Sequence, residues 1–248
     1  MTLVSLGGAR PRVLHAARRP ALVLVAHGSR DAAAAGTTRE VAAAVRAARP
    51  ELDVRLAYLG LDGPLLAEVL DGLAGSAVLV PLLLSRGYHA GVDLPAALAG
   101  APQVRGVVAP PLGPDPLLAE ALADRLWEAG WAGEPVVLAA AGSRDPAAAE
   151  DVRAQARLLA RRLGVAVTPG YVAGAGPRVA EVASGGAAVA GYFTAPGDFA
   201  RLAAAAGSGV TAAPLGAHPA VVRVLLERYA AGVRAVARTG GARAGEKP

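Results

Sequence analysis

The run Ala21-Leu-Val-Leu-Val-Ala26, followed at once by His27-Gly-Ser-Arg-Asp31, decides the fold. A second version occurs further on, where Val136-Val-Leu-Ala-Ala140 is followed by Ala141-Gly-Ser-Arg-Asp145. Each copy is a continuous apolar run of strand length that ends in a glycine turn, which is typical of a parallel strand covered on both faces. The repeat predicts two lobes of the same architecture. Only the first lobe keeps the histidine.

Two more segment pairs extend the repeat along the chain. The segment from Val78 to His89 matches Val189 to Phe199, so Phe199 stands opposite His89. The segment from Ala109 to Pro116 matches Ala213 to Pro219. Both histidines that follow strands therefore belong to the first copy. This asymmetry indicates that chemistry which needs two imidazoles is confined to that half.

Short apolar runs alternate with helical stretches throughout the chain. This alternation predicts an α/β fold with two similar doubly wound parallel-sheet lobes, with ligands bound at the carboxyl ends of the strands. We expect eight strands, the last at 209–213, and helices that include 115–129 after the fourth strand and 217–231 after the eighth. The expected divisions are a disordered basic head (1–20), a first lobe with both histidines (21–132), a degenerate second lobe (133–232) and a disordered tail (233–248).

Composition and charge exclude several classes of function. The chain has no cysteine, so disulfides, thiolate metal sites and cysteine nucleophiles are excluded. The net charge of +5 arises at the two ends: residues 1–20 hold four arginines and no acidic residue, and residues 233–248 hold four basic residues and one acidic. The body carries no pattern for nucleic-acid binding and no apolar run of membrane-spanning length. We expect a cytoplasmic protein with no nucleic-acid or membrane partner.

His27 and His89 are the strongest candidates for a functional site. Each follows a strand, and the first and third strands are neighbours in a doubly wound sheet, so both imidazoles are expected at one sheet edge. Such a pair could bind a divalent metal or accept protons near neutral pH. The alternative for a single histidine is a hydrogen bond that caps the strand. His218 begins the last helix, where a capping or surface role is more usual than a ligand role.

Four polar residues are candidates for binding an anion. Ser29 and Arg30 follow the first strand, Arg86 follows the third, and Arg144 repeats Arg30 in the second copy. Arginine binds carboxylates and phosphates through paired hydrogen bonds, and a glycine turn lets backbone N–H groups approach a ligand. Because the Gly-Ser-Arg sequence recurs in the second copy, part of its role could be turn geometry.

The two histidine motifs together resemble those of the sirohydrochlorin chelatases. The resemblance rests on His27-Gly-Ser-Arg-Asp, on Val80-Pro-Leu-Leu-Leu-Ser-Arg-Gly-Tyr-His89 with Asp93-Leu-Pro95 after it, and on the Pro-Leu-Gly blocks, and it covers about residues 21–231. It implies two α/β lobes that face a central cleft, insertion of Co²⁺ or Fe²⁺ into sirohydrochlorin for cobalamin or siroheme, and His27 and His89 as the metal-handling residues. The divalent metal is then a substrate, and no organic cofactor is expected.

One segment departs from the family pattern. The family usually has a glutamate after the second strand, and this position falls on Gly60 here. Asp62 is the nearby carboxylate, and we expect it to act as the third metal-site residue. The carboxylates of the tetrapyrrole would then bind to Arg30, Arg86 and Arg144.

Three interpretations follow from the sequence. The first is an active sirohydrochlorin chelatase whose fused lobes make it a monomer. The second is a non-catalytic tetrapyrrole or metal carrier of the same fold, because the glutamate is missing. The third is a two-lobed small-anion-binding protein that uses the two Gly-Ser-Arg turns symmetrically.

Overall fold

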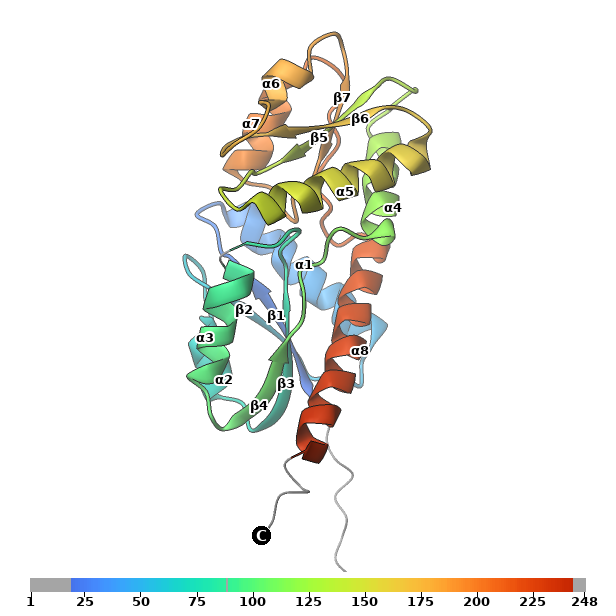
Figure 1. Ribbon diagram of the computed structural model, residues 1–248. Helices are drawn as coiled ribbons and strands as arrows, with labels where there is room; N and C mark the ends of the chain where they lie inside the picture. Colours follow the sequence, from blue (N-terminus) through green and yellow to red (C-terminus); the bar gives the residue numbers. More distant parts are fainter. Residues whose placement is uncertain (1–18, 88, 243–248) are drawn as a thin grey trace, which may run out of the picture.

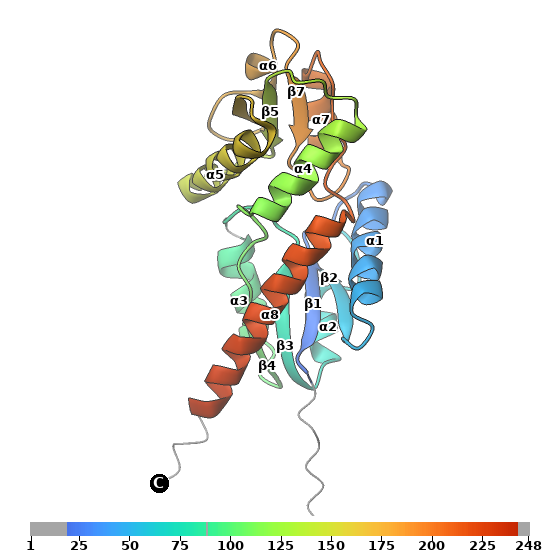
Figure 2. The ribbon, with the colours of Figure 1, turned by 90° about the vertical axis from the view of Figure 1, so that its right-hand side faces the viewer.

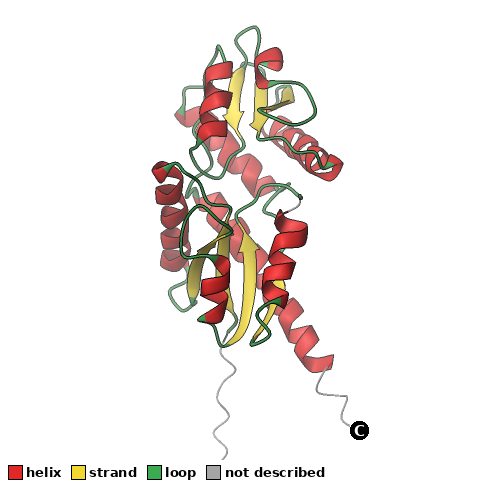
Figure 3. Ribbon diagram, turned by 90° about the vertical axis from the view of Figure 1, so that its left-hand side faces the viewer, coloured by secondary structure: helices red, strands yellow, loops and turns green. Residues whose placement is uncertain are grey.

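The computed structural model describes residues 19–242 except Tyr88, and it describes no side chain for residues 89–90 and 239–242. The predicted basic head lies outside the described residues up to residue 18. The chain forms two α/β lobes stacked end to end, each built on a parallel sheet (Figure 1). Helices cover both faces of each sheet (Figure 3). The predicted fold class is confirmed.

The first sheet has four parallel strands in the order β2-β1-β3-β4. The central strands are buried along their apolar runs, and β1 is buried at every position. In register, Ala26 at the end of β1 lies beside Tyr58 at the end of β2. The strands are β1 (Ala21–Ala26), β2 (Val54–Tyr58), β3 (Gly75–Pro81) and β4 (Val104–Val108).

The second sheet has three parallel strands in the order β6-β5-β7. The strand predicted at 209–213 is reduced to a single bridge between Thr211 and Val189. Gly209 opens this segment and Gly207 lies two residues before it, and glycine weakens a strand because it offers no side chain to pack. The strands are β5 (Val136–Ala140), β6 (Val167–Tyr171) and β7 (Ala188–Gly191).

Several helices begin at residues that the sequence marks as caps. The Asp31, Asp115 and Asp145 carboxylates each accept a hydrogen bond from the backbone N–H two residues on. The helices are α1 (Ala32–Ala48), α2 (Leu66–Asp71), α3 (Leu94–Ala99), α4 (Pro116–Glu128), α5 (Pro146–Leu163), α6 (Val179–Val182), α7 (Asp198–Ala206) and α8 (Pro219–Ala242), with a π-helical turn η1 (His89–Asp93) before α3.

The last helix of each repeat packs on the other lobe. Helix α4 packs against α5 and β7 of the second lobe, whereas α8 packs against β3, β4 and α1 of the first (Figure 2). The sequence-based division assigned 115–129 to the first lobe and 217–231 to the second, so the spatial lobes differ from it. Local pattern shows that a helix has an apolar face but not which sheet that face covers.

Helix α8 also extends further than predicted. Residues 233–248 were expected to be disordered, yet α8 continues to Ala242; residues 243–248 lie outside the described residues. The reason is packing on the first sheet. A Cβ added to Gly232 would lie only 2.3 Å from Cγ1 of Val78 on β3, and Val236, one turn on, is buried. The helix therefore crosses β3 closely, and its apolar face holds the added turns in place.

One hydrophobic core runs through both lobes. It joins Leu24 of β1 and Leu138 of β5 through Leu122 of α4 and Leu225 of α8, all fully or almost fully buried. Smaller clusters cover the opposite face of each sheet. The exchanged helices thus tie the lobes into one packed unit. Among the helices that the structure describes, none is both long and apolar enough to cross a membrane.

Candidate functional site

A cleft of about 1090 Å³ separates the two lobes. It lies at the carboxyl ends of the strands of both sheets, because its walls include Ala26 and Tyr58 from the first lobe and Ala140 and Tyr171 from the second. Parallel α/β sheets bind ligands at this edge. We call it the interlobe cleft.

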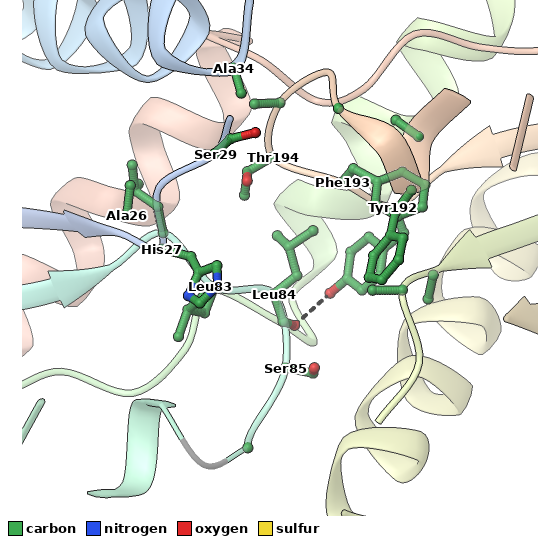
Figure 4. Close-up of a pocket in the computed structure, with 18 of the residues that line it drawn as sticks. Ala26, His27, Ser29, Ala34, Leu83, Leu84, Ser85, Tyr192, Phe193 and Thr194 are labelled. Atoms are coloured by element: carbon green, nitrogen blue, oxygen red, sulfur yellow. Dashed lines mark hydrogen bonds between the residues drawn. The ribbon is translucent and has the colours of Figure 1, made fainter. Parts of the chain in front are cut away.

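His27 lies in the interlobe cleft on the side of the first lobe. It follows β1 directly, its side chain is exposed, and Figure 4 shows it across the cleft from Tyr192 and Phe193. His89 opens η1, two residues after Gly87, which also lines the cleft. The side chain of His89 lies outside the described residues, so the convergence of the two imidazoles stays a prediction.

The Gly-Ser-Arg-Asp turn that follows His27 has a structural role. Gly28 has φ +93°, and a Cβ there would lie 1.8 Å from the Gly60 carbonyl oxygen, so only glycine fits. The Ser29 hydroxyl accepts a hydrogen bond from the Asp31 N–H at 3.1 Å. Asp31 then caps α1. The predicted role of Ser29 in substrate binding stays a prediction, and its hydroxyl already accepts a hydrogen bond within this turn.

The second lobe repeats the same turn. Gly142 has φ +90° and faces the Ala173 carbonyl, and Ser143 accepts from the Asp145 N–H at 3.0 Å. Because the geometry recurs where no histidine precedes it, the turn shapes the strand-to-helix connection rather than binding a metal. Its effect in each lobe is to direct one arginine into the cleft.

Arg30 and Arg144 are the two arginines that these turns present. Both side chains are exposed and line the interlobe cleft from opposite lobes. Within the described part of the chain, neither guanidinium has a hydrogen-bond partner or an ion pair, whereas most arginines of the body have one. Two cationic groups with unused donors suit an anionic ligand between the lobes.

Arg86, a predicted substrate-binding residue, is paired with a carboxylate of the second lobe. Its guanidinium makes paired hydrogen bonds of 2.7 and 3.0 Å to the Asp151 carboxylate of α5, and its backbone N–H donates to the same carboxylate at 2.8 Å. Asp151 is almost fully buried, and its hydrogen bonds and charge raise the pKa of Arg86. Arg86 thus binds a carboxylate, as its chemistry indicates, but the carboxylate belongs to the other lobe.

Known proteins have a similar sequence motif region and a similar architecture. The sequence profile of the CbiX family matches residues 21–129, which hold both histidines. SirB from Bacillus subtilis with Fe³⁺ is 26% identical, with a TM-score of 0.72 over 90% of this chain and 98% of that one. CbiX, the terminal enzyme of siroheme biosynthesis in denitrifying bacteria, is 28% identical, with a TM-score of 0.67 over 85% and 98%. The first part of the chain thus resembles the CbiX family in sequence, and nearly the whole chain shares its fold with solved sirohydrochlorin chelatases.

A further solved structure similar to this chain carries a different metal. The sirohydrochlorin chelatase SirB from Bacillus subtilis subspecies spizizenii, in complex with cobalt, is 26% identical, with a TM-score of 0.68 over 89% of this chain and 96% of that one. No curated protein matches the chain. Iron and cobalt therefore both occur in similar structures, and these structures do not identify a metal for this chain.

Asp62 lies beside the turn that follows His27. Its Oδ2 accepts a hydrogen bond from the Ser29 N–H at 2.8 Å, and Oδ1 has no partner among the described residues. Asp62 lines the interlobe cleft, so the substitute carboxylate expected from the sequence is near the histidine turn. Gly60, at the position of the family glutamate, has no atom within 4 Å of where a Cβ would stand. A side chain there has space.

Sequence patterns missed the contacts that hold the cleft together. Arg201 of α7 in the second lobe forms an ion pair with Asp31 of the first lobe, and its hydrogen bond is the main cause of a lowered pKa of Asp31. The Tyr192 hydroxyl donates to the Leu84 carbonyl at 2.9 Å, drawn as a dashed line in Figure 4. Burial raises the pKa of Tyr192 far above its ordinary range, so the phenol stays protonated. No local sequence pattern marks either of these pairs, because the partners are far apart in sequence.

His218 lies away from the interlobe cleft. Its Nδ1 accepts a hydrogen bond from the Ala220 N–H at 3.1 Å, and its Nε2 lies 3.1 Å from the Asp124 carboxylate of α4. It therefore caps α8 and links it to α4. The predicted capping role is confirmed.

Proposed function

We propose that the protein is an active chelatase that inserts Co²⁺ or Fe²⁺ into sirohydrochlorin, for cobalamin or siroheme, in the interlobe cleft. The observation that carries the proposal is the composition of this cleft: an exposed imidazole, His27, stands at a strand end beside the Asp62 carboxylate, and Arg30 and Arg144 reach in with unused donors. A volume of about 1090 Å³ is at the upper end of ligand pockets, which suits a large flat ring.

The chemistry of the insertion fits these residues. The metal must be bound, lose water and pass to ring nitrogens that release two protons. Neutral imidazoles ligate first-row metals without holding them as tightly as thiolates, and they accept protons near neutral pH. We assign both tasks to His27 and His89, with Asp62 adding a negative charge that offsets the charge of the cation.

The carboxylates of the tetrapyrrole would bind to one arginine from each lobe. Arg30 and Arg144 are exposed and line the interlobe cleft from opposite lobes. Arg86 is already paired with Asp151, so its guanidinium is not assigned to the substrate.

Anaerobic insertion with sirohydrochlorin and each metal tests the proposal. Absorbance follows formation of the metallated ring with and without the protein, because the metal also inserts spontaneously. We expect a rate well above that of the metal and sirohydrochlorin mixed in buffer, with at least one of Co²⁺ and Fe²⁺. A rate equal to the uncatalysed one with both metals contradicts the proposal.

A tetrapyrrole or metal carrier is the second candidate, and Gly60 favours it. No carboxylate occupies the position of the family glutamate, and Asp62 gives one oxygen to the Ser29 N–H. A carrier would bind sirohydrochlorin or the metal tightly without accelerating insertion. Binding measured alongside the insertion rate separates the two candidates.

We also propose that the protein is a monomer. The chain supplies two lobes that share one hydrophobic core, so it already contains the pairing that a single-lobe chain would obtain by dimerisation. Analytical ultracentrifugation at micromolar concentration should give the mass of one chain. A stable dimer at that concentration contradicts this proposal.

A further inference from the structure

Leu61 has an unusual backbone and an unusual exposure. Its φ is +63°, the one positive value among the non-glycine residues that the structure describes. The side chain is 62% exposed and belongs to none of the hydrophobic clusters. A left-handed backbone is unfavourable for a branched side chain, and an exposed leucine gains nothing from burial. The fold alone gives no reason for leucine here.

The second repeat shows what the fold requires at this position. The corresponding loop after β6 has Gly174, with φ +72°, where the loop after β2 has Leu61. Glycine adopts this conformation without strain. The first lobe therefore keeps a strained and exposed leucine where its own duplicate has glycine, and strain of this kind is characteristic of functional sites.

Leu61 lines the interlobe cleft next to the histidine turn. Its Cβ lies 3.3 Å from the point that a Cβ on Gly28 would occupy, and Gly28 follows His27 directly. The apolar side chain is thus held beside the residue to which we assign metal handling.

Phe199 presents a second exposed apolar side chain to the same cleft. It lies in the first turn of α7, its side chain is 46% exposed, and it belongs to none of the hydrophobic clusters. In the repeat it stands opposite His89. Arg201, two residues on, pairs with Asp31, four residues after His27. This ion pair fixes the helix that carries Phe199 against the histidine turn.

We propose that Leu61 and Phe199 form an apolar clamp that holds the flat face of the tetrapyrrole ring beside His27. The inference rests on the proposed function, because it takes the same substrate in the same cleft. A tetrapyrrole has apolar faces and a rim of carboxylates, so apolar side chains suit the faces and Arg30 and Arg144 suit the rim. The two residues position the ring and take no part in proton or metal transfer.

Binding of metal-free sirohydrochlorin to clamp variants tests the proposal. The variants are Leu61→Gly, which copies the second repeat, and Phe199→Ala. Leu65→Ala and Leu202→Ala are matched controls, because both leucines are exposed and near the clamp residues in sequence but outside the cleft. Titration by absorbance gives Kd for sirohydrochlorin, calorimetry with Co²⁺ alone gives metal affinity, and Tm reports the fold.

We expect each clamp variant to bind sirohydrochlorin about tenfold more weakly, as loss of one partly buried apolar contact predicts. KM for the ring should rise with little change in kcat. Co²⁺ affinity should not change, and Tm of Leu61→Gly should not fall, since the strain is relieved. Leu61→Met and Phe199→Tyr, which keep the bulk and the ring, should restore binding.

Two results would overturn the clamp while leaving the proposed function intact. One is wild-type affinity for sirohydrochlorin in both clamp variants, and the other is an equal loss in the controls. A wild-type protein that binds no sirohydrochlorin would overturn the proposed function and the clamp together.

Discussion

At the scale of single residues, the two histidines with described side chains have opposite environments. His27 is exposed in the interlobe cleft, directly after β1, whereas His218 is about nine-tenths buried between α8 and α4. An exposed side chain at a strand end contributes little to packing, and a capping side chain contributes to helix stability. Their replacement by alanine should therefore affect different properties.

His27→Ala should reduce metal insertion at least about 100-fold toward the spontaneous rate, because a metal ligand and proton acceptor is lost. Its Tm should remain close to that of the wild type. His218→Ala should reduce the free energy of unfolding by about 1 kcal/mol and leave the insertion rate of the folded protein unchanged. Insertion assays and urea unfolding of both variants provide the check, and a silent His27→Ala would reject the metal-site assignment.

Asp62 offers a second residue-scale prediction. Asp62→Asn keeps an oxygen that can accept from the Ser29 N–H but removes the charge. If the carboxylate offsets the charge of the cation, the apparent affinity for Co²⁺ in insertion kinetics should fall roughly 10–100-fold. Unchanged kinetics would mean that the Asp62 carboxylate only stabilises the turn and does not contribute to metal binding.

Gly60→Glu complements this variant. It restores a carboxylate at the family position, where no atom lies within 4 Å of the added Cβ, and it should raise the insertion rate. Retained sirohydrochlorin binding with no rise in rate would favour the carrier.

At the scale of elements, α7 is joined to the start of α1 by the pair Arg201–Asp31. The hydrogen bond from Arg201 lowers the pKa of Asp31 below the ordinary value of about 3.9. A carboxyl group with a lowered pKa in the folded state stabilises the protein above its unfolded-state pKa. This contribution disappears as the pH falls through the folded-state pKa.

Arg201→Met should therefore lower the free energy of unfolding at pH 7, and the difference from the wild type should shrink as the pH approaches 3. Both side chains of the pair are partly exposed, so salt should also reduce the difference. Urea unfolding at the two pH values measures it. Arg105→Met, at an exposed position with no ion pair among the described residues, is the control. A difference that does not depend on pH would point to lost packing instead.

Seven of the eight strands predicted from the sequence are present, and the helices predicted at 115–129 and 217–231 correspond to α4 and the first part of α8, because these elements have strong local patterns of apolar residues and caps. The family resemblance predicted a cleft between the lobes, and His27, Arg30, Asp62 and Arg144, which all follow strands, line it. The sequence did not predict the pair Arg86–Asp151, because Asp151 is 65 residues away and no local pattern marks the pair. It also misplaced α4 and α8, since an apolar helix face does not identify its sheet.

At the scale of the whole molecule, the exchange of α4 and α8 makes each lobe depend on the other repeat. The first sheet is covered by a helix from the end of the chain, and the second by a helix from the middle. The interlobe cleft thus lies between two bodies with a common core, which limits how far its walls can separate.

The contact between Gly232 and Val78 tests this exchange directly. An alanine replacing glycine within a helix usually stabilises by about 1 kcal/mol. Here the new Cβ would lie 2.3 Å from Val78, so Gly232→Ala should instead destabilise by about 1–3 kcal/mol. Val78→Ala alone should cost about 2 kcal/mol through lost burial.

The double variant should cost less than the sum of the two single changes, because the smaller residue 78 makes room for the added methyl group. Urea unfolding of the four proteins measures this coupling across the two repeats. Gly36→Ala, in α1 where a Cβ meets no atom within 4 Å, should show the ordinary stabilisation and is the control. Strictly additive effects of the changes at 232 and 78 would mean that α8 does not lie on β3, and the description of two lobes that share one core would fail with it.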